Sequence, residues 1–244
     1  MKRRFKIDIE YDGTNYCGWQ RQTNGCSIQF AIEEALRPLN RNQQVTVIGS
    51  GRTDSGVHAL NQVAHFDLET SLSTESIKNA INAKTPEDIL IYECKEVDSS
   101  FHSRFSAVKR TYIYQVLEKP SAIYRHYSWL PPFGFDFSTL NKCARLVKGK
   151  HDFTSLCRSA TESESKVCII YKSEWTKKEK MLIYKIAGNR FLHSMVRMLV
   201  GCMMEVARGK YIITDFKKLL ENKVGEMQVY TAPSKGLFLL KVEY

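Results

Sequence analysis

The sequence predicts an α+β protein made of two halves that share one order of elements, β-α-β-β-α-β, which is the order of a ferredoxin-like fold. Two observations lead to this fold class. Segments of strand length alternate apolar with polar side chains, and between them lie segments with apolar residues at helical spacing. The 244 residues suffice for two such halves, which we place at residues 1–103 and 104–244. We expect a central mixed or antiparallel sheet and a basic cleft between the halves.

The first half begins with a strand in which Phe5, Ile7 and Ile9 alternate with polar residues, so one of its faces should be buried. Ser27 is a good N-cap residue for the helix that follows, because its hydroxyl can accept a hydrogen bond from a free backbone N–H of the first turn. The elements of this half are predicted at residues 5–11, 28–38, 45–49, 62–68, 74–83 and 89–97.

The second half repeats this order of elements with one addition, a short helix near its end. Its strands and helices are predicted at residues 109–117, 138–147, 168–176, 181–187, 190–207, 215–221 and 237–244. The helix at 190–207 is the longest element, and most of its residues are apolar.

The composition favours a cytoplasmic protein with a polyanionic partner. Lysine and arginine outnumber aspartate and glutamate by 36 to 26, which gives a formal net charge of +10 and favours nucleic acid. The seven cysteines are never in C-x-x-C spacing, so we expect reduced thiols. We find neither a signal peptide nor an apolar segment long enough to cross a membrane.

The strongest candidate for function is the stretch Gly49 to Ala59, G-S-G-R-T-D-S-G-V-H-A. Its glycines predict a sharply bent loop, because glycine adopts positive φ without steric cost. The predicted strands on both sides would hold Arg52 and Asp54 rigidly at a strand end, where reactive side chains often lie. A plain surface turn is the alternative interpretation of this pattern.

Two further elements carry candidate residues. In the helix at 190–207, Arg197 lies opposite the apolar face, as do Arg190 and the following Arg208. These arginines form either a solvated basic face or, at Arg197, a cleft residue that meets phosphate or a buried carboxylate, with Gly201 leaving room for close approach. In the strand at 109–117, Tyr112 and Tyr114 share a face, either as stacking platforms for a nucleobase or as core aromatics.

The loop at residues 11–22 also has two interpretations. Its glycines, Tyr16, Trp19 and Arg21 suit a mobile finger with exposed aromatic rings that grips RNA, or a packed loop with Trp19 in the core.

Several classes of site have no support in the sequence. The six histidines share no ligand spacing, so we expect no metal site. The chain has no G-x-S-x-G motif, no Walker A lysine motif and no G-x-G-x-x-G motif opening a helix, so we expect neither a serine hydrolase nor a nucleotide cofactor.

Six blocks along the chain resemble the tRNA pseudouridine synthase A family and follow the family's order. They are Y-D-G-T-N-Y-C-G-W-Q at 11–20, G-R-T-D-S-G-V-H-A at 51–59, K-R-T-Y-I-Y at 109–114, H-D-F-T-S at 151–155, G-N-R-F-L-H-S-M-V-R at 188–197 and A-P-S-K-G-L-F-L-L-K-V-E-Y at 232–244. The second block is the most specific of the six.

This resemblance implies a pseudouridine-synthase fold and a cofactor-free, metal-free homodimer. The implied reaction isomerises uridine to pseudouridine in the anticodon stem-loop of tRNA, typically at nucleotides 38, 39 and 40, with the target base flipped out of its stack. By position in the motifs, Asp54 corresponds to the catalytic carboxylate and Tyr112 to the tyrosine at the target base. Arg197 corresponds to the arginine that pairs with the aspartate, and Arg52 to a residue that holds the displaced nucleotide.

Three rival functions remain open from the residues alone. A non-catalytic RNA-binding protein would present exposed aromatics in the manner of RRM domains, although the RRM signature is missing. A related synthase could act on other RNAs, and a methyltransferase would need a Gly-rich turn that the chain lacks. The chemical route of the aspartate is also open, because it could attack C1′ or C6 of the nucleotide or act as a base in an elimination.

Overall fold

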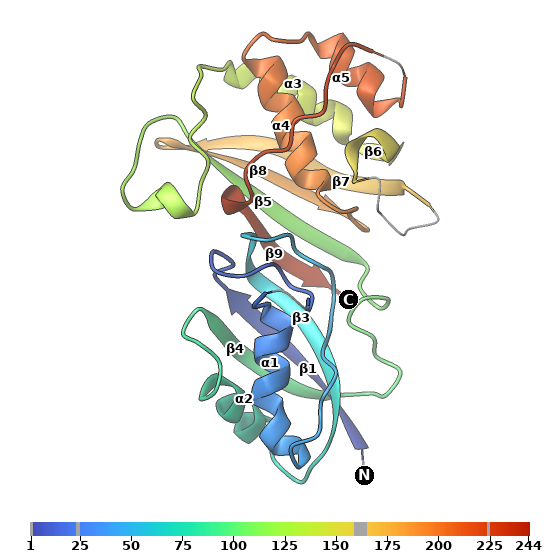
Figure 1. Ribbon diagram of the computed structural model, residues 1–244. Helices are drawn as coiled ribbons and strands as arrows, with labels where there is room; N and C mark the ends of the chain where they lie inside the picture. The colour runs from blue at the N-terminus through green and yellow to red at the C-terminus, as the bar shows by residue number, and fades with distance from the viewer. Residues whose placement is uncertain (1, 23–24, 159–164, 224) are drawn as a thin grey trace. The chain divides into compact units, whose positions relative to one another are not determined.

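The computed structural model describes residues 2–22, 25–158, 165–223 and 225–244 (Figure 1). It forms two compact units. The first contains Met1–Val108 together with Phe238–Tyr244, and the second contains Lys109–Leu237.

The first unit has the predicted order β-α-β-β-α-β, completed by the last strand of the chain. Its elements are β1 (Lys2–Tyr11), α1 (Ile28–Leu36), β2 (Ile48–Gly49), β3 (His58–Glu69), α2 (Thr74–Asn82), β4 (Ile89–Val97) and β9 (Leu237–Glu243). The strand β1 lies between β4 and β3 and is antiparallel to both. Both β2 and β9 pair with β3, β2 antiparallel at Ala64 and His65, and β9 parallel at His58 and Ala59.

The helices α1 and α2 lie on one face of this sheet and close the core of the unit (Figure 1). The core forms as the alternation predicts, because Phe5, Ile7 and Ile9 of β1 are fully buried. Ser27 is the N-cap of α1, where its Oγ accepts from the Phe30 N–H at 3.3 Å. This hydrogen bond satisfies one of the backbone donors that every helix start leaves open.

The second unit has an antiparallel sheet in the order β5-β8-β7-β6. Its elements are β5 (Lys109–Leu117), α3 (Phe137–Val147), β6 (Gly149–Asp152), β7 (Val167–Lys178), β8 (Met181–Gly188), α4 (Met195–Ala207) and α5 (Ile213–Leu220). The three helices lie together over one face of the sheet (Figure 1). The short strand β6 is an addition to the predicted elements.

The observed division differs from the predicted one in the closing strand. The prediction assigned all of residues 104–244 to the second half, whereas Phe238–Tyr244 belongs to the first unit. The reason is strand pairing, since Phe238 and Leu239 lie in register with residues of β3. Hydrogen bonds strengthen the link, because the Val108 N–H donates to the Glu243 carbonyl at 2.8 Å.

The long helix begins later than predicted, at Met195 and not at residue 190. Asn189 explains the delay, because its N–H donates to the Ile169 carbonyl at 3.1 Å and its Oδ1 accepts from the Ile169 N–H at 2.9 Å. These bonds keep the chain alongside β7 after β8 has ended. Ser194 then turns the chain with a φ of 59°, and the helix follows.

His65 connects β3 to the segment that follows β4. It is 2% exposed, and its Nδ1 accepts from the Ser103 N–H at 3.2 Å. The Ser103 hydroxyl in turn donates to the Ile48 carbonyl at 2.6 Å. Burial, with the positive charge of Arg4 and the neighbouring His102, lowers the pKa of His65 to about 4.

We expect the free energy of unfolding to fall as the pH is lowered from about 6.5 to about 4, because His65 takes up a proton in the unfolded chain before it does so in the folded one. Denaturant unfolding at several pH values above 4.5 measures this slope. The variant His65→Gln should flatten the slope, while His126→Gln, at an exposed position, should keep it. Equal slopes in both variants would assign the pH dependence to other groups.

Candidate functional site

The predicted functional loop lies where the sequence places it, between β2 and β3 of the first unit. Its first residues are tied to β3. The Ser50 N–H donates to the Val63 carbonyl at 2.7 Å, and the Ser50 hydroxyl donates to the Gln62 side chain at 2.6 Å. The Gln62 amide donates back to the Gly51 carbonyl at 3.0 Å. Residues just before Asp54 are therefore held by a buried hydrogen-bond network.

A tight turn follows at Asp54. The Val57 N–H donates to the Asp54 carbonyl at 3.1 Å, and Gly56 adopts a φ of 72°, which glycine tolerates without strain. The carbonyl of Tyr16 accepts from the Gly56 N–H at 3.3 Å and from the Ser55 hydroxyl at 3.1 Å. The turn is thus closed both within itself and by the loop that follows β1.

Asp54 itself is half-buried, and Arg52 is exposed. Thr53 between them is buried, and its Oγ1 lies 2.8 Å from the Tyr11 hydroxyl. The Thr53 carbonyl accepts from the Trp19 N–H at 3.1 Å. Because Thr53 is buried and held by two hydrogen bonds, it restricts the directions in which the neighbouring Asp54 carboxylate can point. A reactive group needs such fixed positioning.

The loop at residues 12–20 packs directly against the Asp54 loop. A Cβ at Gly18 would lie 2.4 Å from the Thr53 carbonyl oxygen, and one at Gly13 would lie 2.0 Å from the Val57 carbonyl oxygen. Only glycine allows this approach, and Gly18 also has a φ of 100°. Tyr16 and Trp19 are 5% and 3% exposed. The expectation of exposed rings is therefore wrong, and Trp19 is packed as the alternative interpretation has it.

His58 and Asp12 also support the loop, and sequence reasoning did not assign them a role. His58 is fully buried, with its Nδ1 3.0 Å from Asp12 Oδ1 and accepting from the Gly13 N–H at 3.1 Å. Its ring stacks on Phe238 of β9 with centroids 4.6 Å apart. Their presence in two of the quoted blocks was the available signal.

In the second unit, the two tyrosines of β5 have different surroundings. Tyr114 is fully buried, its hydroxyl donates to the Pro233 carbonyl at 2.7 Å, and burial raises its pKa. It is a core aromatic. Tyr112 is 8% exposed and meets the Phe191 ring edge-to-face at 5.2 Å.

Arg197 projects from α4 and is half-buried. Its Nε donates to the Ala232 carbonyl at 2.8 Å, and the Ala232 N–H donates to the Arg197 carbonyl at 3.1 Å. This reciprocal pair fixes the base of the guanidinium. The room at Gly201 is occupied by protein, because a Cβ there would lie 2.1 Å from the Tyr230 carbonyl oxygen.

The predicted basic face of the long helix is not present as a single face. Arg190 precedes α4, and Arg208 is its C-cap, where it forms an ion pair of 2.7 Å with Glu205. The predicted site residues are thus divided between the units: Arg52 and Asp54 belong to the first, and Tyr112 and Arg197 to the second.

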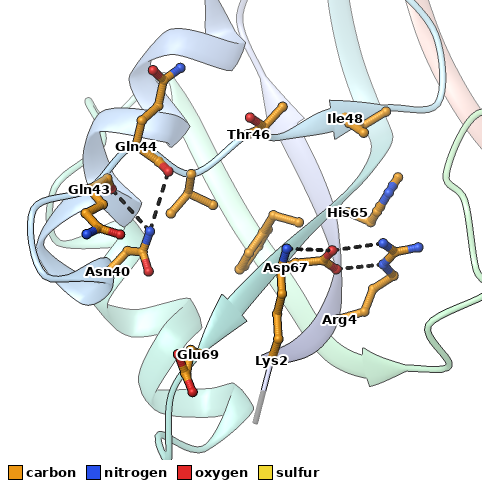
Figure 2. A pocket seen from close by; sticks show the side chains of 12 residues that line it. Lys2, Arg4, Asn40, Gln43, Gln44, Thr46, Ile48, His65, Asp67 and Glu69 are labelled. Carbon is orange, nitrogen blue, oxygen red and sulfur yellow. Dashed lines mark hydrogen bonds and ion pairs between the residues drawn. The ribbon is translucent and has the colours of Figure 1, made fainter.

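The first unit also has a surface cavity of about 400 Å³, whose lining includes none of the predicted site residues (Figure 2). Three of its charged groups, those of Lys2, Arg4 and Asp67, are bound to one another. Arg4 forms a two-pronged ion pair with Asp67 at 2.7 and 2.9 Å, and Lys2 lies 3.7 Å from the same carboxylate (Figure 2). The Arg4 guanidinium lowers the pKa of Asp67. These groups link the neighbouring strands β1 and β3.

The described part of the chain contains no cluster of three or more histidine, cysteine, aspartate or glutamate side chains that could hold a metal ion. Nor does any helix within it have the length and apolarity needed to cross a membrane.

The chain is similar to known proteins over nearly its full length. A family described as tRNA pseudouridine synthase matches residues 8–106 and 143–244. A protein named tRNA pseudouridine synthase A from Anoxybacillus flavithermus is 41% identical over 243 residues, covering 99% of both chains. Proteins of the same name from Exiguobacterium sibiricum and Bacteroides thetaiotaomicron are each 40% identical, covering 99% of this chain and 97% and 91% of theirs.

Among solved structures, a chain from an archaeal box H/ACA sRNP Nop10-Cbf5 complex superposes with a TM-score of 0.36 and 8% identity, covering 82% of this chain and 43% of that chain.

We expect Gly18→Ala to lower the free energy of unfolding by about 1–3 kcal/mol, because the added methyl group meets the Thr53 carbonyl at a positive φ. Denaturant unfolding measures this change. Gly51→Ala is the matched control in the neighbouring loop, since a Cβ there meets nothing within 4 Å. It should change the stability by less than about 1 kcal/mol. Equal losses in the two variants would show that close packing at Gly18 is not what matters.

Proposed function

Because the chain belongs to the tRNA pseudouridine synthase family, we propose that it isomerises uridine to pseudouridine in tRNA, with Asp54 as the catalytic carboxylate. The observation that carries the proposal is the Asp54 loop, in which the most specific family block forms a rigid turn around a half-buried carboxylate. The net charge of +10 favours the polyanionic substrate.

The reaction explains why a carboxylate is needed. The bond between C1′ of the ribose and N1 of uracil breaks, the base turns, and C1′ bonds to C5. C5 gives up its proton and N1 takes one up, so that no atom or electron is gained or lost overall. An ionised aspartate can act as a nucleophile or a base without further activation, whereas a hydroxyl group would need a base of its own. The attack at C1′, the attack at C6 and the elimination route all start from this ionised group.

Arg197 is proposed as the counter-ion of Asp54. A carboxylate that enters a water-poor site stays charged only if a cation compensates it, and a guanidinium can do so with two parallel hydrogen bonds. The bond from Arg197 Nε to Ala232 supports this role, because a guanidinium anchored at its base loses less freedom on binding a carboxylate.

Tyr112 and Arg52 are proposed to bind the substrate. Tyr112 would contact the target base after it has left its stack, and its small exposed fraction and edge-to-face contact with Phe191 suit a ring held at a pocket wall. Arg52 would hold the displaced nucleotide, and its exposure two positions before Asp54 suits a phosphate contact.

The proposal extends to the setting of the reaction. We propose the anticodon stem-loop as the target region, in line with the family resemblance, and a homodimer as the active form. The enzyme would act in the cytoplasm without a cofactor, since an isomerisation needs neither an electron carrier nor a group donor. The seven cysteines are all free thiols, which suits a reducing compartment.

We expect Asp54→Asn to reduce pseudouridine formation by roughly a thousandfold or more while tRNA binding is retained, because the amide cannot act as nucleophile or base. Nucleoside chromatography of an unmodified tRNA transcript, incubated without added cofactor, measures the product. Glu87→Gln removes an exposed carboxylate of the same unit and should leave the rate unchanged. If wild type binds tRNA but forms no pseudouridine, the chain is an RNA-binding module and the catalytic proposal fails.

We expect Arg197→Met to reduce the rate roughly 10- to 100-fold with little change in tRNA affinity, because it removes the partner of the reacting carboxylate. Single-turnover kinetics and a binding titration separate the two quantities. In the Asp54→Asn background the same substitution should cost little more, and Arg145→Met, at an exposed arginine of α3, should be neutral. An equal loss of rate and affinity would place Arg197 on a phosphate.

A further inference from the structure

The second unit has a loop that the proposed function does not use, residues 118–131 between β5 and α3, which we call the projecting loop. In Figure 1 it is the green loop with a short helical turn that extends away from the sheet of its unit. The turn is formed by Tyr124–His126. We infer that the projecting loop is a tRNA-binding element, in which aromatic rings stack on unpaired bases and cations contact phosphates.

The base of the projecting loop is firmly attached. Trp129 is 5% exposed and pairs with the strand, since its N–H donates to the Gln115 carbonyl at 3.0 Å and its carbonyl accepts from the Leu117 N–H at 2.8 Å. The Trp129 ring also stacks on Tyr230 at 6.2 Å. Glu118 forms an ion pair of 2.8 Å with Lys177. A loop anchored in this way presents its tip in a defined position.

The tip is built by its own hydrogen bonds. The Ser128 hydroxyl donates to the Tyr124 carbonyl at 2.5 Å, and the Tyr124 N–H donates to Ser121 Oγ at 3.3 Å. Arg125 donates from its guanidinium to the Ala122 carbonyl. A preformed tip loses little conformational entropy when it binds a partner.

The tip of the projecting loop exposes three large apolar or aromatic side chains. Ile123 is 76% exposed, Tyr124 43% and Tyr127 37%. Clustered exposed apolar side chains on an ordered element usually mark an interaction site. Flat rings with polar ends are also the groups on which unstacked nucleobases bind.

The positive charge of the projecting loop favours nucleic acid as its partner. Lys119 and Arg125 are exposed cations, and residues 119–131 contain no aspartate or glutamate. Lys235 adds a further cation beside the tip, where its Nζ donates to the Arg125 carbonyl at 2.9 Å. In a symmetric contact with a second copy these cations would meet no carboxylate from residues 119–131, and Glu118 at the base of the loop is already paired with Lys177. Phosphates would neutralise them.

The inference rests on the proposed function for its choice of tRNA as the RNA. The test is the variant Tyr124→Ala/Arg125→Gln, titrated with unmodified tRNA transcript at several salt concentrations. We expect the Kd to rise about 10-fold or more, from the lost stacking and phosphate contacts. The slope of log K against log salt should fall in magnitude by about 0.7 to 0.9 for the one lost phosphate contact. The rate at saturating tRNA should match wild type.

Two further variants test whether the effect is specific to the projecting loop and whether it depends on charge. Tyr171→Ala/Lys178→Gln removes an exposed tyrosine and an exposed cation from β7 of the same unit and should bind tRNA as wild type does. Arg125→Glu reverses one exposed charge, whereas Arg125→Gln removes it, and both lose the bond to the Ala122 carbonyl. Arg125→Glu should therefore weaken binding more. Thermal unfolding confirms that each variant is folded.

The possible outcomes separate this inference from the proposed function. An unchanged Kd and salt slope in the tip variant, with wild type isomerising tRNA normally, would overturn the inference alone. A change in sedimentation without a change in Kd would make the projecting loop a contact between copies, and would also overturn it. If wild type binds tRNA without forming pseudouridine and the tip variant binds more weakly, the proposed function fails and the inference stands.

Discussion

The close approach of two backbone segments is the constraint on which the candidate site depends. The loop at 12–20 touches the Asp54 loop at distances that exclude any side chain at Gly13 or Gly18. This contact buries Trp19, brings the Tyr16 carbonyl to the turn and leaves Thr53 bonded on two sides. Main-chain packing therefore fixes the position of Asp54, and a bound substrate could shift it only at a cost in packing energy.

Much of the fold could be predicted because local pattern and tertiary structure agree. The strands β4 and β5 have the predicted bounds, since alternating side chains at those positions face a core on one side. The start of α4 could not be predicted, because the apolar pattern continues into residues that Asn189 holds beside β7. The placement of β9 in the first unit depends on its pairing with β3, a partner far away in the sequence.

In the candidate site, too, local features could be predicted from the sequence and contacts between distant residues could not. The loop around Asp54 and its place between two strands could be predicted, because a Gly-rich segment with a carboxylate between two strands is a local feature. The burial of the aromatic rings could not be predicted, because Trp19 packs on Gly49, which belongs to a different segment. A Cβ at Gly49 would lie 2.5 Å from the indole ring. The supporting contact between His58 and Asp12 likewise joins positions that no local pattern relates.

The membership of β9 in the first unit has a consequence for synthesis. As the chain leaves the ribosome, residues 1–108 emerge long before Phe238, on which the buried His58 ring stacks. Until residues 238–244 have emerged, the unit that carries Asp54 lacks the strand β9. A product terminated before Phe238 would therefore carry the Asp54 motif without the packing that β9 adds to it.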